Sequence, residues 1–169
     1  MQKRTLKTLT AILTLSFLLG FPGCAKPVSC EILAERFADA LMRGSGEDAL
    51  SLMPEEILNY MYENEKRNPN ELARNLTRHF KRSLAAFTLR HGPVRFYTCR
   101  IKCFRDYSEE SLARLNARCR QYRFTANAAR ELTIAITLTL ESGAEVSLSF
   151  SLEIFRIGAN WYLGDRYGI

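Results

Sequence analysis

Histidine is scarce in this chain: only His79 and His91 occur among its 169 residues. Acid–base catalysis and metal binding draw heavily on imidazole, so this scarcity removes many common arrangements. The sequence also has no glycine-rich phosphate loop, no His-Glu-x-x-His helix and no nucleophile elbow. His79 lies beside the apolar stripe of a predicted helix, where a solvated histidine is more usual than a general base, and His91 is expected in a loop. No catalytic residue, cofactor site or metal site is therefore predicted.

The first 23 residues lack acidic side chains and lack an apolar run long enough to stay in a bilayer. Lys3, Arg4 and Lys7 precede an apolar run from Leu9 to Leu19, and small or turn-forming residues follow it. A permanent transmembrane helix needs about 20 apolar residues. This layout is typical of an export signal, and it predicts a cleaved signal peptide over residues 1–23.

The end of this leader resembles the lipobox of bacterial lipoproteins, whose cysteine is lipidated and becomes the new N-terminus. Gly23 and Cys24 match that pattern, whereas Phe21 and Pro22 replace its usual Leu and its usual Ala or Ser. The resemblance implies acyl chains such as palmitate on Cys24, with residues 24–29 as a tether. Each buried methylene contributes about 0.8 kcal/mol, so several chains would anchor the protein firmly. The alternative is a plain secreted protein in which this cysteine is incidental.

The net charge of +6 does not by itself indicate a nucleic-acid partner, because three of the cations belong to the leader. Without the three leader cations, 21 basic and 18 acidic residues remain, a net charge of +3 that is ordinary for a soluble domain. Nucleic acid is not an expected partner, given the predicted export. Basic residues do gather in the middle of the chain, where a solvated surface or a patch that contacts anionic lipid or wall polymer would explain them. These residues are Arg90, Arg95, Arg100, Lys102, Arg105, Arg114, Arg118, Arg120 and Arg123.

Residues 30 to 91 carry apolar residues at helical spacing, and cap residues mark where the helices begin. Ser29 is expected to cap a helix that runs through Met42, with Gly44 at its end. Asn68 and Pro69 open the longest helix, which continues toward Phe87. Two shorter helices are predicted between them, from Asp48 to Met53 and from Pro54 onward.

The C-terminal half reads as a sheet because apolar and polar residues alternate over long stretches. Two strands joined by a turn at residues 141–144 each have one apolar and one polar face, as antiparallel sheets do. A first strand runs from Val94 to Phe104, and a helix from Ser108 to Tyr122 follows it. A bulge is predicted near residues 155–157, before a return strand through Trp161. The predicted apolar face is Leu132, Ile134, Ile136, Leu138, Leu140, Val146, Leu148, Phe150, Leu152 and Ile154, with Tyr97, Cys99, Ile101 and Cys103 on the first strand. The predicted core is Leu33, Phe37, Leu76, Phe80, Ile101, Leu115, Ile136, Phe150 and Trp161.

This order of elements resembles the nuclear transport factor 2-like superfamily over residues 30–169. The resemblance rests on residues 38–44, on Leu52-Met53-Pro54, and on the final hairpin, residues 157–163. It implies an α+β fold in which N-terminal helices cap a curved antiparallel sheet, a cone, with an extra helix between the first and second long strands. Small bacterial lipoproteins of unassigned function are similar in this way.

The resemblance leaves three functional classes open. The first is a membrane-anchored extracytoplasmic binding or accessory module whose recognition surface lies near the helix at residues 108–122. The second is an enzyme that uses the cone, whose conceivable polar occupants are Asp39, Tyr60 and Tyr97, although none matches a family motif. The third is an interaction scaffold for envelope proteins. Threonines and serines on the outer face of the sheet favour a monomer or a small polar dimer.

Four cysteines follow Cys24: Cys30, Cys99, Cys103 and Cys119. Cys99 and Cys103 would lie about 13 Å apart along a strand, too far to hold one zinc ion together. Cys103 and Cys119 are the pair most expected to be close and are candidates for a disulfide. The alternative is that all four are small, reduced core residues.

The predicted address can be tested at Cys24. The protein is expected on the outer side of the cytoplasmic membrane, or on an outer membrane where the cell has one. Cys24→Ala should move it from the membrane fraction to the soluble fraction and abolish labelling by an alkyne fatty acid, because the acylated thiol is gone. Labelling that survives the substitution would contradict lipidation at this residue.

Overall fold

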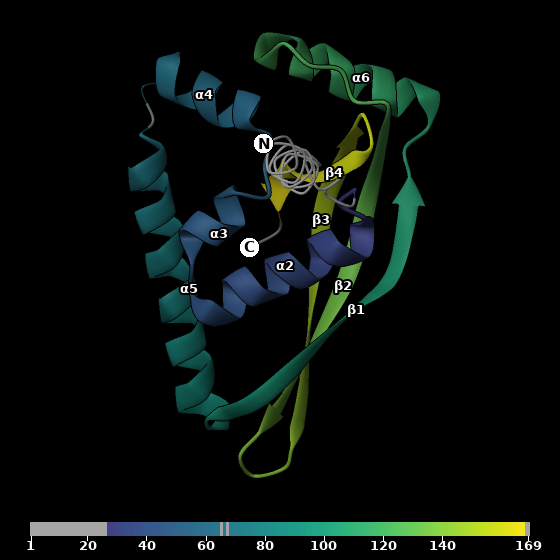
Figure 1. Cartoon of the computed structure of the whole chain (residues 1–169). Helices are drawn as coiled ribbons and strands as arrows, with labels where there is room; N and C mark the ends of the chain where they lie inside the picture. Colours follow the sequence, from purple (N-terminus) through teal and green to yellow (C-terminus); the bar gives the residue numbers. More distant parts are fainter. Residues whose placement is uncertain (1–26, 65, 67, 168–169) are drawn as a thin grey trace, which may run out of the picture.

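Four antiparallel strands form one open sheet in the order β1-β2-β3-β4 (Figure 1). The strands are β1 (Val94–Asp106), β2 (Ala128–Leu140), β3 (Glu145–Ile157) and β4 (Asn160–Tyr167). This computed structural model describes residues 27–64, 66 and 68–167. The predicted signal peptide and Cys24 lie outside the described residues, so their roles stay predictions.

Helices precede the sheet, and one helix interrupts it between β1 and β2. They are α2 (Cys30–Arg43), α3 (Gly46–Leu50), α4 (Glu55–Glu63), α5 (Pro69–His91) and α6 (Glu109–Cys119), followed by the 3₁₀ helix η1 (Arg120–Tyr122). The predicted α+β class is confirmed, as are the caps Ser29 and Asn68, whose side chains accept hydrogen bonds from the first turns of α2 and α5. No helix in the described ranges combines the length and apolar character that crossing a bilayer requires.

The inner face of the sheet is buried under α2. The register aligns Ile101, Ile134 and Phe150 across three strands, and the ring of Phe37 meets the ring of Phe150 edge to face at 6.2 Å. Leu33 and Phe37 of α2 are fully buried. Every residue of the predicted core is buried or packed against the core, which confirms that prediction.

Two local predictions are wrong: the bounds of one short helix and the position of a bulge. The short helix after α2 spans Gly46–Leu50 rather than Asp48 to Met53, because Ser45 caps it by accepting a hydrogen bond from the Asp48 amide at 3.1 Å. The bulge expected at residues 155–157 is absent from the β2–β3 pairing, which stays regular there. The irregular step lies instead between Leu152 and Ile154, where β3 pairs with β4.

Apolar residues follow one another at residues 154–155 because both faces of the sheet are covered at this end. Phe155 points to the outer face, where the ring of Phe124 stacks on it at 5.4 Å. Tyr122 of η1 continues this row of rings, with Phe124 on one side and Tyr60 of α4 on the other, at 6.1 Å and 5.1 Å. The outer face is therefore covered around Phe155, while Ser147, Ser149 and Ser151 nearer the β2–β3 turn are exposed.

Helices α3 and α5 meet at Gly46, a residue without a side chain. A Cβ atom added at Gly46 would lie 2.1 Å from the carbonyl oxygen of Ala73 and 2.7 Å from the Cβ of Leu76. The amide of Gly46 also donates to Oγ1 of Thr77 at 2.9 Å. Only glycine permits this approach, because the nearest atoms belong to a helix backbone that cannot retreat.

Gly46→Ala is expected to lower the free energy of unfolding by about 3 kcal/mol, since overpacking against a backbone is costly. Urea denaturation would measure this loss. Gly143→Ala is the matched control: φ is 85° there and no atom lies within 4 Å of the added Cβ, so only backbone strain of about 1 kcal/mol is expected. Equal losses in the two variants would contradict the steric account.

Candidate functional site

The structure brings Asp39 and Tyr97 together and leaves Tyr60 elsewhere. The hydroxyl of Tyr97 on β1 donates to Oδ1 of Asp39 on α2 at 2.5 Å. This hydrogen bond is the main reason that the pKa of Tyr97 is raised to about 12, and partial burial adds to it. Tyr60 packs instead against Tyr122. Asp39 also lines a surface cavity of about 240 Å³ with Arg36, Arg43 and Asp48 among its neighbours.

Both histidines lie on the surface of α5. His79 is exposed in the middle of the helix, and His91 is its last residue, so the expectation of a loop at His91 is wrong by one residue. The ring of His91 lies 4.7 Å from that of Phe87. Neither imidazole lines the cavities described below, which agrees with a solvated histidine at position 79.

The structure describes Cys30, Cys99, Cys103 and Cys119, and it joins no two of these four by a disulfide. Cys30 and Cys119 are buried and Cys99 is half-buried, whereas Cys103 is exposed. The prediction that Cys103 shares the apolar face of β1 with Cys99 is wrong, and Cys103 is not a small core residue. The register shifts between Ile101 and Cys103, which pairs Cys103 with the outer-face residue Thr133. The disulfide between Cys103 and Cys119 stays a prediction.

Cys30 and Cys99 line a cavity of about 210 Å³ between α2 and β1. Burial raises the pKa of the Cys99 thiol to about 11 and also raises the pKa of Cys30. Arg130 donates to the sulfur of Cys30 at 3.5 Å, but its guanidinium is also held over the rings of Phe104 and Trp161. These thiols therefore stay protonated near neutral pH and are poor nucleophiles.

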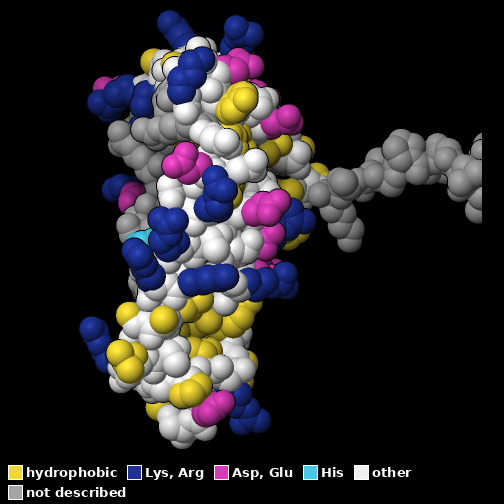
Figure 2. Space-filling model, turned by 90° about the vertical axis from the view of Figure 1, so that its left-hand side faces the viewer, with side chains coloured by type: hydrophobic (Ala, Val, Ile, Leu, Met, Phe, Trp, Pro, Cys, Tyr) yellow, Lys and Arg dark blue, Asp and Glu magenta, His cyan; other side chains and the backbone are white. Residues whose placement is uncertain are grey.

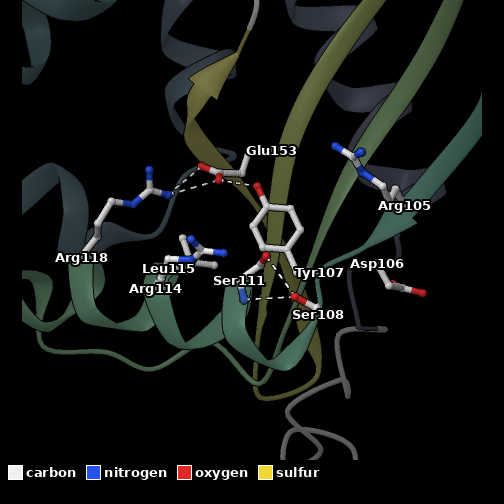
Figure 3. Close-up of a pocket in the computed structure, with 9 residues that line it drawn as sticks. All are labelled: Arg105, Asp106, Tyr107, Ser108, Ser111, Arg114, Leu115, Arg118 and Glu153. Carbon is white, nitrogen blue, oxygen red and sulfur yellow. Dashed lines mark hydrogen bonds and ion pairs between the residues drawn. The ribbon is translucent and has the colours of Figure 1, made fainter.

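A cavity of about 640 Å³ lies between α6 and the outer face of the sheet. Ser111, Arg114, Leu115 and Arg118 line it from α6, because residues three and four apart share one face of a helix. The sheet side and the turn into α6 contribute Arg105, Asp106, Tyr107, Ser108 and Glu153 (Figure 3). The sequence predicts a recognition surface at the open end of the cone near residues 108–122. This cavity borders the same helix but lies on the outer face of the sheet, and its role stays a proposal.

A buried carboxylate organises one wall of this α6 pocket. Glu153 is only 8% exposed, and Tyr107 donates to its Oε1 at 2.7 Å. Arg118 donates to both carboxylate oxygens at 3.2 Å. In Figure 3 the two donors reach Glu153 from different sides. Burial, and then the bond to Glu153, raises the pKa of Tyr107 to about 12, so this phenol stays a donor at neutral pH.

The other two arginines of the pocket pair with acidic residues at the protein surface. Arg114 pairs with Glu110 one helical turn away at 3.4 Å, and both side chains are more than 70% exposed. Arg105 pairs with Glu131 on β2, also at the surface. Exposed ion pairs of this kind contribute about 0–1 kcal/mol, so an incoming anion can replace either acidic partner. Figure 3 shows Arg105 and Arg114 on opposite sides of the Tyr107 ring.

Sequence patterns did not single out Tyr107 or Glu153. Glu153 falls in the polar phase of its strand, like Ser149 and Ser151, so alternation predicts a wet position for it. Phe155, the next residue on the same face of the strand, was the available signal. An apolar residue at that position indicates that the outer face is covered there. No group of three or more potential metal-ligating residues occurs within the described ranges.

Comparisons of the chain with protein-family models, with curated proteins and with solved structures found no match.

The two tyrosine–carboxylate bonds predict a loss of stability at high pH. The pKa values of Tyr97 and Tyr107 are raised from 10.0 to about 12 in the folded protein, so folding favours the protonated phenols. Their contribution is complete below pH 10 and is lost as the pH rises through about 12. Urea denaturation near these two pH values should show a fall in the free energy of unfolding. The fall should be smaller in the double variant Tyr97→Phe/Tyr107→Phe.

Tyr62→Phe is the control for this measurement, because Tyr62 is exposed on α4. It should leave the fall in stability at high pH as it is in the unaltered protein. A double variant that loses stability as steeply as the unaltered protein would show that the two phenols are not linked to folding.

Proposed function

We propose that this protein is a membrane-anchored, extracytoplasmic binding or accessory module that takes a small anionic ligand in the α6 pocket. The observation that carries the proposal is the pair Arg105 and Arg114, two exposed cations that line one cavity and whose acidic partners, Glu131 and Glu110, also lie at the protein surface. The hydroxyls of Ser108 and Ser111 lie in the same lining. Carboxylate and phosphate groups are the ligands that guanidinium groups bind best.

The lining favours binding over catalysis. Both oxygens of the Glu153 carboxylate already accept hydrogen bonds from Tyr107 or Arg118, so this group is occupied by partners within the protein. The phenol of Tyr107, with its pKa raised to about 12, is held as a donor. Glu153 and Arg118 form an ion pair in one wall. The lining also holds Asp106, which pairs with Arg130, so three arginines and two acidic residues leave it a net charge of +1.

The proposed address and fold come from the sequence. Gly23 and Cys24 support lipidation, with residues 1–23 as signal peptide and 24–29 as tether. Support for a nuclear transport factor 2-like cone comes from the chain order: helices, β1, the extra helix α6, and a final hairpin through Trp161. In this proposal α2 caps the concave side of the sheet. The ligand site then lies on the opposite side, at the end of the sheet next to α6.

An enzyme remains the second candidate because of one observation, the short bond between Tyr97 and Asp39. A carboxylate that accepts a hydrogen bond from a phenol brings together two residue types that act in acid–base catalysis. Only Asp39 of the two lines the cavity of about 240 Å³ on its side, and that cavity is small. Loss of a small-molecule turnover in Asp39→Ala would favour this alternative over the binding module.

Ligand binding is tested by isothermal titration calorimetry with inorganic phosphate, citrate and glucuronate. At least one of these anions should bind the unaltered protein, and Arg105→Gln/Arg114→Gln should weaken its affinity about 10-fold or more. The reason is that a hydrogen bond to a charged group contributes about 1.5–3 kcal/mol.

Arg120→Gln is the matched control, since Arg120 is exposed just beyond α6 and does not line the pocket. This variant should bind as the unaltered protein does. Absence of heat with all three anions, or an affinity that the double substitution leaves unchanged, would refute an anion site in the α6 pocket.

A further inference from the structure

The long helix α5 carries a row of cations on the side that faces away from the core. Arg74, Arg78 and Arg82 repeat every fourth residue, and Lys81 falls on the same side, opposite the fully buried Phe80. The helix contains five Lys and Arg residues but a single acidic one, in its first turn. Figure 2 shows the α5 side of the molecule, where Lys and Arg side chains gather over the middle of the face.

No acidic side chain among the described residues neutralises this row. Arg74, Arg78, Lys81 and Arg82 are all exposed, and none of them forms an ion pair within the described part of the chain. Arg78 makes one hydrogen bond, to Oδ1 of Asn75 at 3.4 Å. Like charges four residues apart weaken an isolated helix, so the row does not serve the stability of α5 itself.

The cations border a hollow and are followed by an exposed apolar residue. The hollow has a volume of about 510 Å³ and is lined by Arg74, Thr77, Arg78, Lys81, Arg82 and Ala85. Leu89 lies one turn beyond Ala85 on the same side of the helix and is 91% exposed. This face of α5 thus offers positive charge along two turns and then an unpartnered aliphatic side chain.

We propose that this cationic face of α5 docks on an anionic lipid surface. Phosphate headgroups match the guanidinium groups, and the adjoining acyl region matches Leu89, so one planar partner satisfies both halves of the face. Single-stranded nucleic acid fits less well, because no aromatic side chain lies between Arg74 and Leu89 on this face to stack on bases. Docking of this kind would hold the α6 pocket at a fixed height above the membrane.

The inference stands apart from the ligand site and from lipidation. It uses no residue of the α6 pocket, and its electrostatic attraction needs no acyl chain on Cys24. Each cation close to an anionic membrane raises partitioning about fivefold, so three neutralised arginines should lower it about 100-fold. Added salt should weaken the contact, because the Debye length falls to about 8 Å at physiological ionic strength.

The test measures co-sedimentation of the full chain with vesicles of phosphatidylglycerol and phosphatidylcholine. All proteins carry Cys24→Ala, so that acylation cannot contribute. Binding to the anionic vesicles should fall about 100-fold in Arg74→Gln/Arg78→Gln/Arg82→Gln. The control Arg36→Gln/Arg43→Gln/Lys66→Gln removes the same charge from exposed positions outside α5 and outside the basic stretch at residues 90–123, and it should bind as the parent does.

A second readout places the contact on α5 rather than on the cationic leader. Leu89→Trp adds an exposed indole, whereas the native Trp161 is only 8% exposed. Its emission should shift to the blue with anionic vesicles, and the shift should vanish when the three α5 arginines are neutralised. Equal losses in both triple variants, an unshifted emission, or binding to soluble polyphosphate but not to vesicles would each overturn the proposal.

Discussion

Burial of the inner face of the sheet beneath α2 is the contact on which the rest of the structure depends. Phe37 packs on Phe150, the thiol of Cys99 donates to the Ala34 carbonyl at 3.6 Å, and Tyr97 donates to Asp39. Three strands and one helix are thereby locked in a single register. The next layer then follows, because α3 turns directly out of α2 at Gly44 and meets α5 through Gly46. The long helix α5 needs little burial of its own and can devote its outer side to charge.

One end of the sheet differs from the other because it is covered on both faces. Leu152 and Ile154 point inward to the core, while Glu153 and Phe155 point outward and are buried as well. A carboxylate in such a position requires partners, and Tyr107 and Arg118 supply them. No buried side-chain nitrogen or oxygen within the described residues is left without a hydrogen bond. The α6 pocket lies where this polar network separates α6 from the sheet.

Local sequence patterns were sufficient for the elements and insufficient for the site. Alternation over 132–154 and the cap residues Ser29 and Asn68 predict strands and helices within a few residues, since these signals depend on near neighbours. Alternation also identifies which residues share a face, but not what covers that face. Glu153 was assigned to solvent for this reason. Cys103 was misplaced because a register shift in an edge strand leaves no mark among the polar residues around it.

The way α6 is fastened bears on the entropy of any association at its pocket. Before the helix, the Tyr107 amide donates to the Ala129 carbonyl at 3.0 Å. Near its end, the Asn116 side chain exchanges two hydrogen bonds with the backbone of Ala126, at 3.0 and 2.8 Å. The helix is therefore preorganised, and a ligand bound beside it would order only exposed side chains such as Arg105 and Arg114. At about 0.5–1.5 kcal/mol for each immobilised side chain, that leaves most of the contact energy available as affinity.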